Sequence, residues 1–138
     1  MPRASAFAAL IVLAPLPAGA ADAEPADPAP FEGRWSIGFP KREDAPARKP
    51  VLTCDEPAEI ALVGENLIRV TRPDAKKARE WEVMDFGGRN PWWPVDGAGD
   101  TWVTEWRGED SFLLADTKKP DSFSSDWKKA KLWTRCPE

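Results

Sequence analysis

The sequence predicts an all-β fold, a small antiparallel barrel of about eight strands with one disulfide and no long helix in its folded part. From residue 31 onward, apolar and polar residues alternate over short runs, and Gly, Pro, Asn and Asp separate these runs. Two pairs of runs are joined by three-residue turns, which is typical of hairpins. A two-sheet sandwich would produce a similar pattern and is the alternative. We favour the barrel because closure leaves no exposed strand edge.

The expected strands follow one another at short intervals. The first alternates so that Phe31, Trp35 and Phe39 lie on one face. The turns at 64–66 and 108–110 contain Gly, together with Asn in one turn and Asp in the other, and each predicts a hairpin. The expected strands are residues 31–39, 51–54, 59–63, 67–71, 80–86, 101–107, 111–116 and 131–136.

Residues 1–20 have the three parts of a cleavable signal peptide. Arg3 supplies the positive start, residues 6–16 form the apolar run, and Ala18-Gly19-Ala20 is a small-x-small cleavage pattern. The apolar run is shorter than the roughly 20 residues that a membrane-spanning helix needs, and no later segment is long and apolar enough to cross a bilayer. We therefore expect cleavage near Ala20 and a periplasmic or secreted product.

Cleavage would leave a leader, residues 21–30, before a single β-rich domain, residues 31–138. The leader consists of Ala, Pro and acidic residues, so it has nothing to bury and is expected to be flexible. The full chain carries a formal net charge of -4, and its basic residues occur in short groups near acids. This pattern argues against a nucleic-acid partner, which requires a clustered positive field. We expect a monomer.

The chain has two cysteines, Cys54 and Cys136. In an oxidising compartment an isolated pair most simply forms a disulfide. A metal-binding or redox-active pair is the alternative, but the spacing is not Cys-x-x-Cys and the chain contains no His. We therefore predict a structural disulfide that ties the end of the domain back to its beginning.

The residue inventory argues against an enzyme. Without His, catalytic triads and imidazole bases are excluded. With both cysteines paired, zinc and copper sites are not expected either, and we predict no metal and no cofactor. Carboxylates are frequent in the middle of the chain, but no spacing among them singles out an acid/base pair.

Residues 87–99 form the most unusual segment, because two adjacent tryptophans stand between prolines. We expect a stiff loop in which Arg89, Trp92 and Trp93 form a platform for a sugar, a peptide or a protein partner. The alternative is that the rings fill the core of a small domain that has few large aliphatic residues. Adjacent residues on an extended chain point to opposite sides, so one ring buried and one exposed is a further possibility.

Three other tryptophans are candidates for the interior of a barrel. Trp102 and Trp106 lie four residues apart in one expected strand and therefore on the same face, and Trp81 lies in another strand. If the interior is large enough to hold a ligand, these rings would form its apolar lining.

The first strand carries a family resemblance. Phe31-Glu32-Gly33-Arg34-Trp35 resembles the Gly-x-Trp opening strand of the calycin group, which includes lipocalins, avidins and bacterial secreted metalloprotease inhibitors. In lipocalin-like members an Arg near the end of the last strand packs across that Trp, and Arg135 stands at the corresponding place. The resemblance implies an eight-stranded barrel in which Gly33, Trp35 and Arg135 are structural. The chain has no Tyr, which argues against an avidin-like biotin site.

The first functional hypothesis is a non-catalytic binding module outside the cytosol, such as an inhibitor or an envelope protein partner. The second is a lipocalin-like carrier of a small apolar ligand, and the third is an enzyme that uses carboxylates. A ligand-sized interior would favour the carrier, whereas a packed interior with an exposed Trp92 or Trp93 would favour the docking module.

Overall fold

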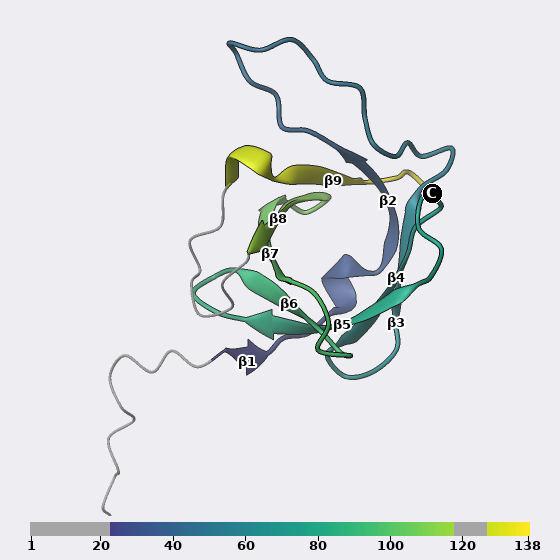
Figure 1. Ribbon diagram of the computed structural model, residues 1–138, viewed down its shortest axis with the longest axis vertical. Coiled ribbons are helices and arrows are strands. Elements are labelled where there is room, and N and C mark those ends of the chain that lie inside the picture. Colours follow the sequence, from purple (N-terminus) through teal and green to yellow (C-terminus); the bar gives the residue numbers. More distant parts are fainter. Residues whose placement is uncertain (1–22, 118–126) are drawn as a thin grey trace, which may run out of the picture.

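The structure, a computed structural model, describes residues 23–117 and 127–138. Within these residues the strands β2 to β9 form a closed antiparallel barrel of eight strands (Figure 1). The predicted barrel is confirmed, and the sandwich alternative is wrong. The predicted signal peptide, residues 1–20, lies outside the described residues.

The barrel is a simple meander. Each strand from β2 to β8 pairs with the next one along the chain, and β9 pairs back onto β2 to close the sheet. The described elements are β1 (Glu24–Pro25), η1 (Ala29–Phe31), β2 (Gly33–Gly38), β3 (Ala58–Leu62), β4 (Leu67–Thr71), β5 (Arg79–Asp85), β6 (Asn90–Pro94), β7 (Thr101–Gly108), β8 (Ser111–Thr117), η2 (Trp127–Lys129) and β9 (Lys131–Arg135).

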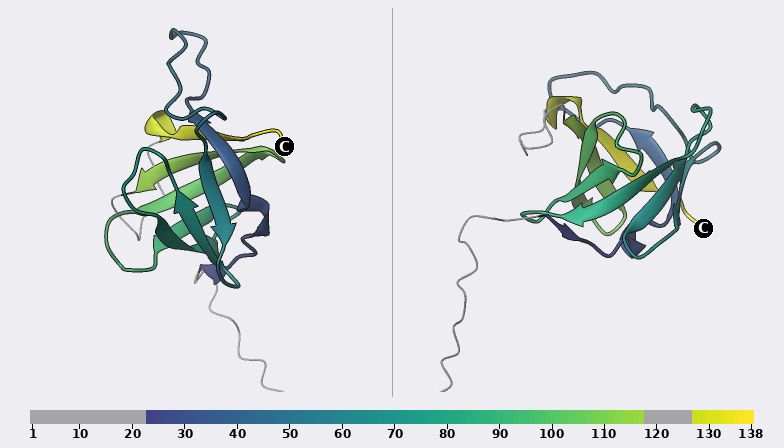
Figure 2. Two further views of the ribbon diagram at one scale, coloured as in Figure 1. Left: turned by 90° about the vertical axis from the view of Figure 1, so that its right-hand side faces the viewer. Right: turned by 60° about the horizontal axis from the view of Figure 1, so that its bottom comes forward.

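The two ends of the barrel differ. At the end that we call the open end, the connections 39–57, 72–78 and 95–100 join the strands. At the other end, which we call the closed end, the connections are short, and the turn η1 lies inside the ring of strands (Figure 1). Residues 39–50 form an excursion that projects away from the barrel, as the two further views also show (Figure 2).

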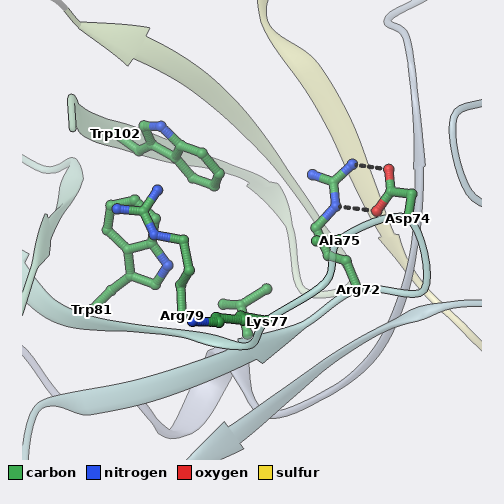
Figure 3. Close-up of a pocket in the computed structure, with 8 residues that line it drawn as sticks. Arg72, Asp74, Ala75, Lys77, Arg79, Trp81 and Trp102 are labelled. Carbon is green, nitrogen blue, oxygen red and sulfur yellow. Dashed lines mark hydrogen bonds and ion pairs between the residues drawn. The ribbon is translucent and has the colours of Figure 1, made fainter. Parts of the chain in front are cut away.

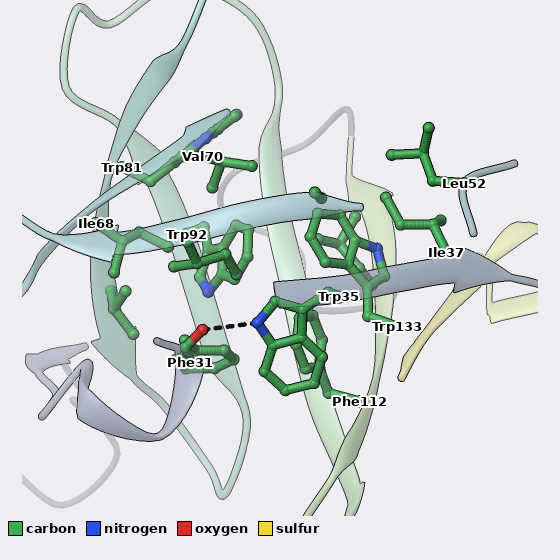
Figure 4. Close-up of a cluster of buried hydrophobic side chains, with 14 residues drawn as sticks. Phe31, Trp35, Ile37, Leu52, Ile68, Val70, Trp81, Trp92, Phe112 and Trp133 are labelled. Atoms are coloured by element: carbon green, nitrogen blue, oxygen red, sulfur yellow. Dashed lines mark hydrogen bonds between the residues drawn. The ribbon is translucent and has the colours of Figure 1, made fainter. Parts of the chain in front are cut away.

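Aromatic rings fill most of the barrel interior. The alternation along each strand sends every second side chain inward, as Trp35 and Ile37 do in β2. The indole N–H groups of Trp92 and Trp133 are buried and have no acceptor among the described residues. These two rings therefore stabilise the barrel mainly by filling space in its interior. The fully buried rings are Phe31, Trp35, Trp81, Trp92, Phe112 and Trp133 (Figure 4).

A second, smaller apolar cluster is separate from the interior. It consists of Leu113 and Ala115 of β8 and Ala130, with Leu132 and the ring of Trp127 packed against them. Phe112 and Leu114 of β8 belong to the interior cluster, so the alternation of β8 places Leu113 and Ala115 on its other face. The turn η2 thus supplies an aromatic cover for part of the outer barrel wall.

The number of barrel strands agrees with the prediction, but one strand differs. The expected strand at 51–54 contributes only an isolated bridge between Leu52 and Ile37. Its place in the barrel is taken by β6, within the segment 87–99 that we expected to be a loop. Pro91 and Pro94 suggested a loop. In the barrel, however, β7 pairs with residues 90–92 of β6, and β5 pairs with residues 92–94. Each proline therefore faces only one paired neighbour, which is the setting in which a strand tolerates Pro.

The expected flexible leader is partly ordered. Glu24 and Pro25 pair with Asp85 and Met84 of β5, and the Ala26 N–H donates to the carbonyl of Val83 at 3.0 Å. The chain then enters η1 and buries Phe31 in the core. The leader therefore belongs to the fold from residue 24 onward, because it closes the end of the barrel.

Cys54 and Cys136 form the predicted disulfide, with their Cα atoms 5.6 Å apart. Both cysteines contact Arg34 of β2. The Cys136 N–H donates to the Arg34 carbonyl at 2.8 Å, and the Arg34 guanidinium donates to the Cys54 carbonyl at 3.3 Å. The bond therefore joins the segment before β3 to the end of β9, the two strands that flank β2 in the sheet.

Candidate ligand site at the open end of the barrel

A pocket of about 280 Å³ opens at the open end of the barrel (Figure 3). Its walls come from the end of β4, the connection between β4 and β5, the beginning of β5 and the beginning of β7. The volume lies just under the range of about 300 to 1,000 Å³ that is usual for sites of drug-sized ligands. The lining residues are Val70, Arg72, Asp74, Ala75, Lys77, Arg79, Trp81 and Trp102.

Two stacked tryptophans form the apolar wall of the pocket. The ring centroids of Trp81 and Trp102 lie 4.5 Å apart with an interplanar angle of 30°. Trp81 is 1% exposed, whereas Trp102 is only partly buried and packs against the edge of the core. Behind both rings lies Trp92, 6.3 Å from each. The pocket wall is therefore continuous with the rigid interior.

Arg79 lies across the face of Trp81. Its guanidinium carbon is 4.5 Å from the ring centroid, a cation–π contact, and its Nη2 donates to the Ala98 carbonyl at 2.8 Å. The acceptor belongs to the turn between β6 and β7, where the Ala98 N–H donates to the Asp96 carboxylate at 2.9 Å. Gly99 follows with a φ of +85°, and a Cβ there would stand 3.4 Å from Arg79 Nη2. Glycine thus gives this turn its shape and leaves room for the guanidinium.

Arg72 and Asp74 form the opposite wall. The guanidinium Nε and Nη2 of Arg72 donate to the two carboxylate oxygens of Asp74 at 2.8 and 2.7 Å. These hydrogen bonds, together with the Arg72 charge, outweigh desolvation and lower the pKa of the Asp74 carboxyl from its ordinary value of 3.8. The carboxyl is therefore ionised at neutral pH and neutralises Arg72.

The remaining charge at the pocket is positive. Lys77 and Arg79 both line it, and neither has an ion-pair partner among the residues that the structure describes. The chain as a whole carries a net charge of -4. The pocket thus combines an aromatic wall with local positive charge on an otherwise acidic molecule.

The three tryptophans expected in the interior are divided between the two ends. Trp81 and Trp102 meet at the pocket, as a lining role requires. Trp106 packs near the closed end instead, with its ring centroid 4.7 Å from that of Phe31 and 6.1 Å from that of Trp35.

Gly33, Trp35 and Arg135 meet at the closed end. The Arg135 guanidinium carbon lies 4.4 Å from the Trp35 ring centroid, and a Cβ on Gly33 would stand 2.8 Å from Arg135 Nη1. Arg135 also donates to the carbonyls of Pro30 and Glu32, both at 2.7 Å. This group fastens η1 into the barrel, and it lies at the end opposite the pocket.

The expected platform of Arg89, Trp92 and Trp93 is not a loop. Trp92 is fully buried in the interior, and Trp93, the next residue of β6, is only partly exposed and pairs with Glu82 of β5. Arg89 lies 3.3 Å from a carboxylate oxygen of Glu105 and over the ring of Trp127. The three side chains therefore do not form one surface, because a strand sends neighbouring residues to opposite sides.

Sequence reasoning missed the cationic part of the pocket. Arg72, Lys77 and Arg79 lie between the expected strands 67–71 and 80–86, where the sequence predicted no binding site. A usable signal was present, since this basic connection leads directly into a strand whose inward positions begin with Trp81. In a barrel, such a connection lies over the mouth.

Comparisons of the chain with protein-family models, with curated proteins and with solved structures gave no match. Within the described ranges, no three His, Cys, Asp or Glu residues are placed to hold a metal ion, and no helix has the length and hydropathy of a membrane span. The chemistry of the pocket is therefore the basis for a functional proposal.

Proposed function

We propose that the protein is a non-catalytic binding protein that holds a small flat apolar molecule at the open end of its barrel. The observation that carries this proposal is the stacked pair of Trp81 and Trp102 in the wall of a pocket of about 280 Å³. Rigid aromatic walls contribute large contact area at little conformational cost, which suits them to flat ligands. Among the hypotheses from the sequence, this geometry favours the small-ligand carrier.

A non-catalytic role is supported by the residue inventory. The chain has no His, and both cysteines are in the disulfide. Asp74, the acid among the residues that line the pocket, accepts hydrogen bonds from two nitrogens of the Arg72 guanidinium. Its lowered pKa is the opposite of what a general acid at neutral pH needs.

The calycin resemblance supports the same proposal. The barrel is a closed eight-stranded meander compatible with that group. The Trp35–Arg135 stack joins the first barrel strand to the last, as the resemblance implies. In such a barrel, the pocket at the open end is the entrance for a ligand.

Binding can be tested with 2-naphthalenemethanol, a neutral flat probe, by ligand-detected NMR. We expect Trp102→Ala to weaken binding at least tenfold, because it removes the partly exposed half of the stack. Trp93→Ala is the matched control, since this ring lies outside the pocket lining and should leave affinity unchanged. Equal binding of the probe by Trp102→Ala and Trp93→Ala would overturn the proposal.

Docking to a protein partner is the second candidate. The excursion projects away from the barrel (Figures 1 and 2). Its residues 41–50 are all exposed, and the Arg48 guanidinium carbon lies 3.7 Å from the centroid of the Phe39 ring. A partner that uses this arm should be captured from envelope extract by the wild type and lost when residues 41–49 are replaced by a short Gly-Ser linker. Capture that is unchanged by the replacement would contradict docking through the excursion.

We also infer that the protein acts outside the cytosol. The pattern at residues 1–20 and the disulfide between two distant cysteines support this inference. N-terminal sequencing of protein purified from a bacterial envelope fraction should begin at Ala21. An N-terminus at Met1, or recovery only from cytosol, would contradict it.

A further inference from the structure

We infer that the pocket selects ligands that carry an anionic group on a flat aromatic ring, and that Arg79 and Lys77 are the selecting residues. This inference rests on the proposed function and adds the chemical class of the ligand, a small aromatic acid. It follows from the way the cations are held at the pocket.

Arg79 is preorganised for an anion. Its guanidinium lies on the ring of Trp81, and its Nη2 donates to the Ala98 carbonyl. These two contacts fix the position of the guanidinium. No carboxylate within the described residues forms an ion pair with it, so donors on Nε and Nη1 stay available to a ligand. A guanidinium that is already positioned loses little further freedom when it binds a carboxylate through two hydrogen bonds.

Lys77 and Arg72 make different contributions. Lys77 lines the same pocket and is likewise without an ion-pair partner among the described residues, so it adds a second available positive charge. Arg72 spends two of its nitrogens on Asp74, and the pair is neutral as a unit. The charge that a ligand meets is therefore that of Lys77 and Arg79.

The arrangement also places the apolar part of a ligand. In Figure 3, Trp102, Trp81 and Arg79 stand on one side of the pocket, and Arg72 with Asp74 stands on the other. Arg79 already covers the face of Trp81, so the ring of a ligand would pack on Trp102 and beside Val70, which is 5% exposed. Its anionic group would then reach Arg79 and Lys77, and a neutral ligand would leave both cations unpaired.

The test compares 2-naphthoate with 2-naphthalenemethanol, which share the ring system and differ in the charged group. For the wild type we expect the acid to bind at least tenfold more tightly, with an advantage that shrinks as salt rises. Arg79→Gln should reduce the affinity for the acid at least tenfold and that for the alcohol less than twofold. Lys77→Gln should reduce the affinity for the acid about threefold.

Lys76→Gln is the matched control, because it removes the same charge from the same connection at a residue that does not line the pocket. It should change neither affinity by more than twofold. Equal affinities for acid and alcohol, or an acid affinity that Arg79→Gln leaves unchanged, would overturn the anion selectivity while the binding function stands. Failure of both probes to bind would overturn both proposals. An unchanged thermal midpoint shows that each variant is folded.

Discussion

Arg135 connects three parts of the closed end. Besides its stack on Trp35, it donates to the carbonyls of Pro30 and Glu32 in and after η1, and its Nε donates to Asp110 at 3.1 Å. We expect Arg135→Ala to lower the free energy of unfolding by about 2 to 4 kcal/mol, because charged hydrogen bonds and the cation–π contact are lost together. Urea denaturation measures this change.

Arg69→Ala is the control for that measurement. Arg69 also pairs with a carboxylate, Glu80, at 2.9 Å, but its side chain is 49% exposed. Its removal should cost no more than about 1 kcal/mol. Similar losses in the two variants would show that Arg135 does no more than an ordinary surface arginine.

Asp74 gives stability a specific dependence on pH. The Arg72 hydrogen bonds lower the pKa of the folded carboxyl below its ordinary 3.8, so the pair stabilises the fold above pH 3.8. This contribution is lost as pH falls through the lowered pKa. Asp74→Asn should therefore cost at most about 1 kcal/mol at pH 7, since the pair is partly exposed, and nothing at the acid limit.

Urea denaturation at several pH values tests this prediction. Arg72→Gln removes the same pair from the other side and should show the same pH dependence. The double variant should have about the same free energy of unfolding as the less stable of the two single variants, because the two residues act as one pair. If the free energies of unfolding of Asp74→Asn and the wild type still differ at the lowest pH, the stabilisation does not come from the ionised Asp74 carboxyl.

Single residues were predictable only where a short pattern ties them together. Gly33, Trp35 and Arg135 were expected together because the Gly-x-Trp opening strand and an Arg near the end of the last strand resemble the calycin pattern. Arg79 offered no such pattern, because its position depends on the Ala98 carbonyl across the barrel mouth. A contact between a side chain and a distant backbone group leaves no trace in residue spacing.

At the scale of elements, η1 is the part of the leader that stabilises the barrel. The ring of Phe31 is 1% exposed and meets Trp92 and Phe112 edge to face, and its carbonyl accepts from the Trp35 indole at 2.9 Å. Phe31→Ala should lower the free energy of unfolding by about 3 to 5 kcal/mol, because it leaves a cavity between rigid rings. Urea denaturation gives the value.

The strand β1 should matter much less. It has two exposed residues, and with Ala26 it adds only a few hydrogen bonds along β5. A chain that begins at Asp27 should therefore lose less than about 2 kcal/mol. A larger loss than that of Phe31→Ala would mean that β1, and not η1, holds the closed end.

Element prediction succeeded where turn chemistry was explicit. The hairpins β3–β4 and β7–β8 have almost the expected bounds, because Gly-containing three-residue turns separate clearly alternating runs. Prediction failed for β6, where Pro91 and Pro94 suggested a loop. A proline prevents strand formation only where its missing N–H would have to donate to a neighbouring strand. Whether it must do so here depends on which residues of β6 pair with β5 and which with β7, and the sequence does not show this.

For the whole molecule, the disulfide is the main constraint on the unfolded chain. Cys54 and Cys136 are separated by 82 residues. In the chain-entropy model a closed loop of this length contributes about 4 to 5 kcal/mol. Replacing both cysteines with Ser should lower the urea midpoint accordingly, and wild type in reductant should give the same curve. A loss below about 1 kcal/mol would show that the reduced chain is already constrained.

The fold class was predictable at this scale, and the position of the pocket was not. Short alternating runs, few large aliphatic residues and eight tryptophans together indicate a closed sheet filled with rings. Which of these rings lines a cavity depends on how completely the others fill the interior. The stack of Trp81 on Trp102 is set by a register across three strands, and local spacing does not encode it.

The route of the disulfide has a consequence for how the barrel could be divided. A nick in the exposed excursion would leave both cysteines in the larger fragment, and β2 would belong to a separate peptide. The disulfide would still join the segment before β3 to the end of β9, the two strands that flank β2. The position of β2 in the sheet would therefore stay bordered on both sides. The separate peptide would bring the Phe31 and Trp35 rings into the core and would complete the barrel without a covalent link to the larger fragment. The protein is thus a natural candidate for fragment complementation, with recovery of near-ultraviolet ellipticity reporting reassembly.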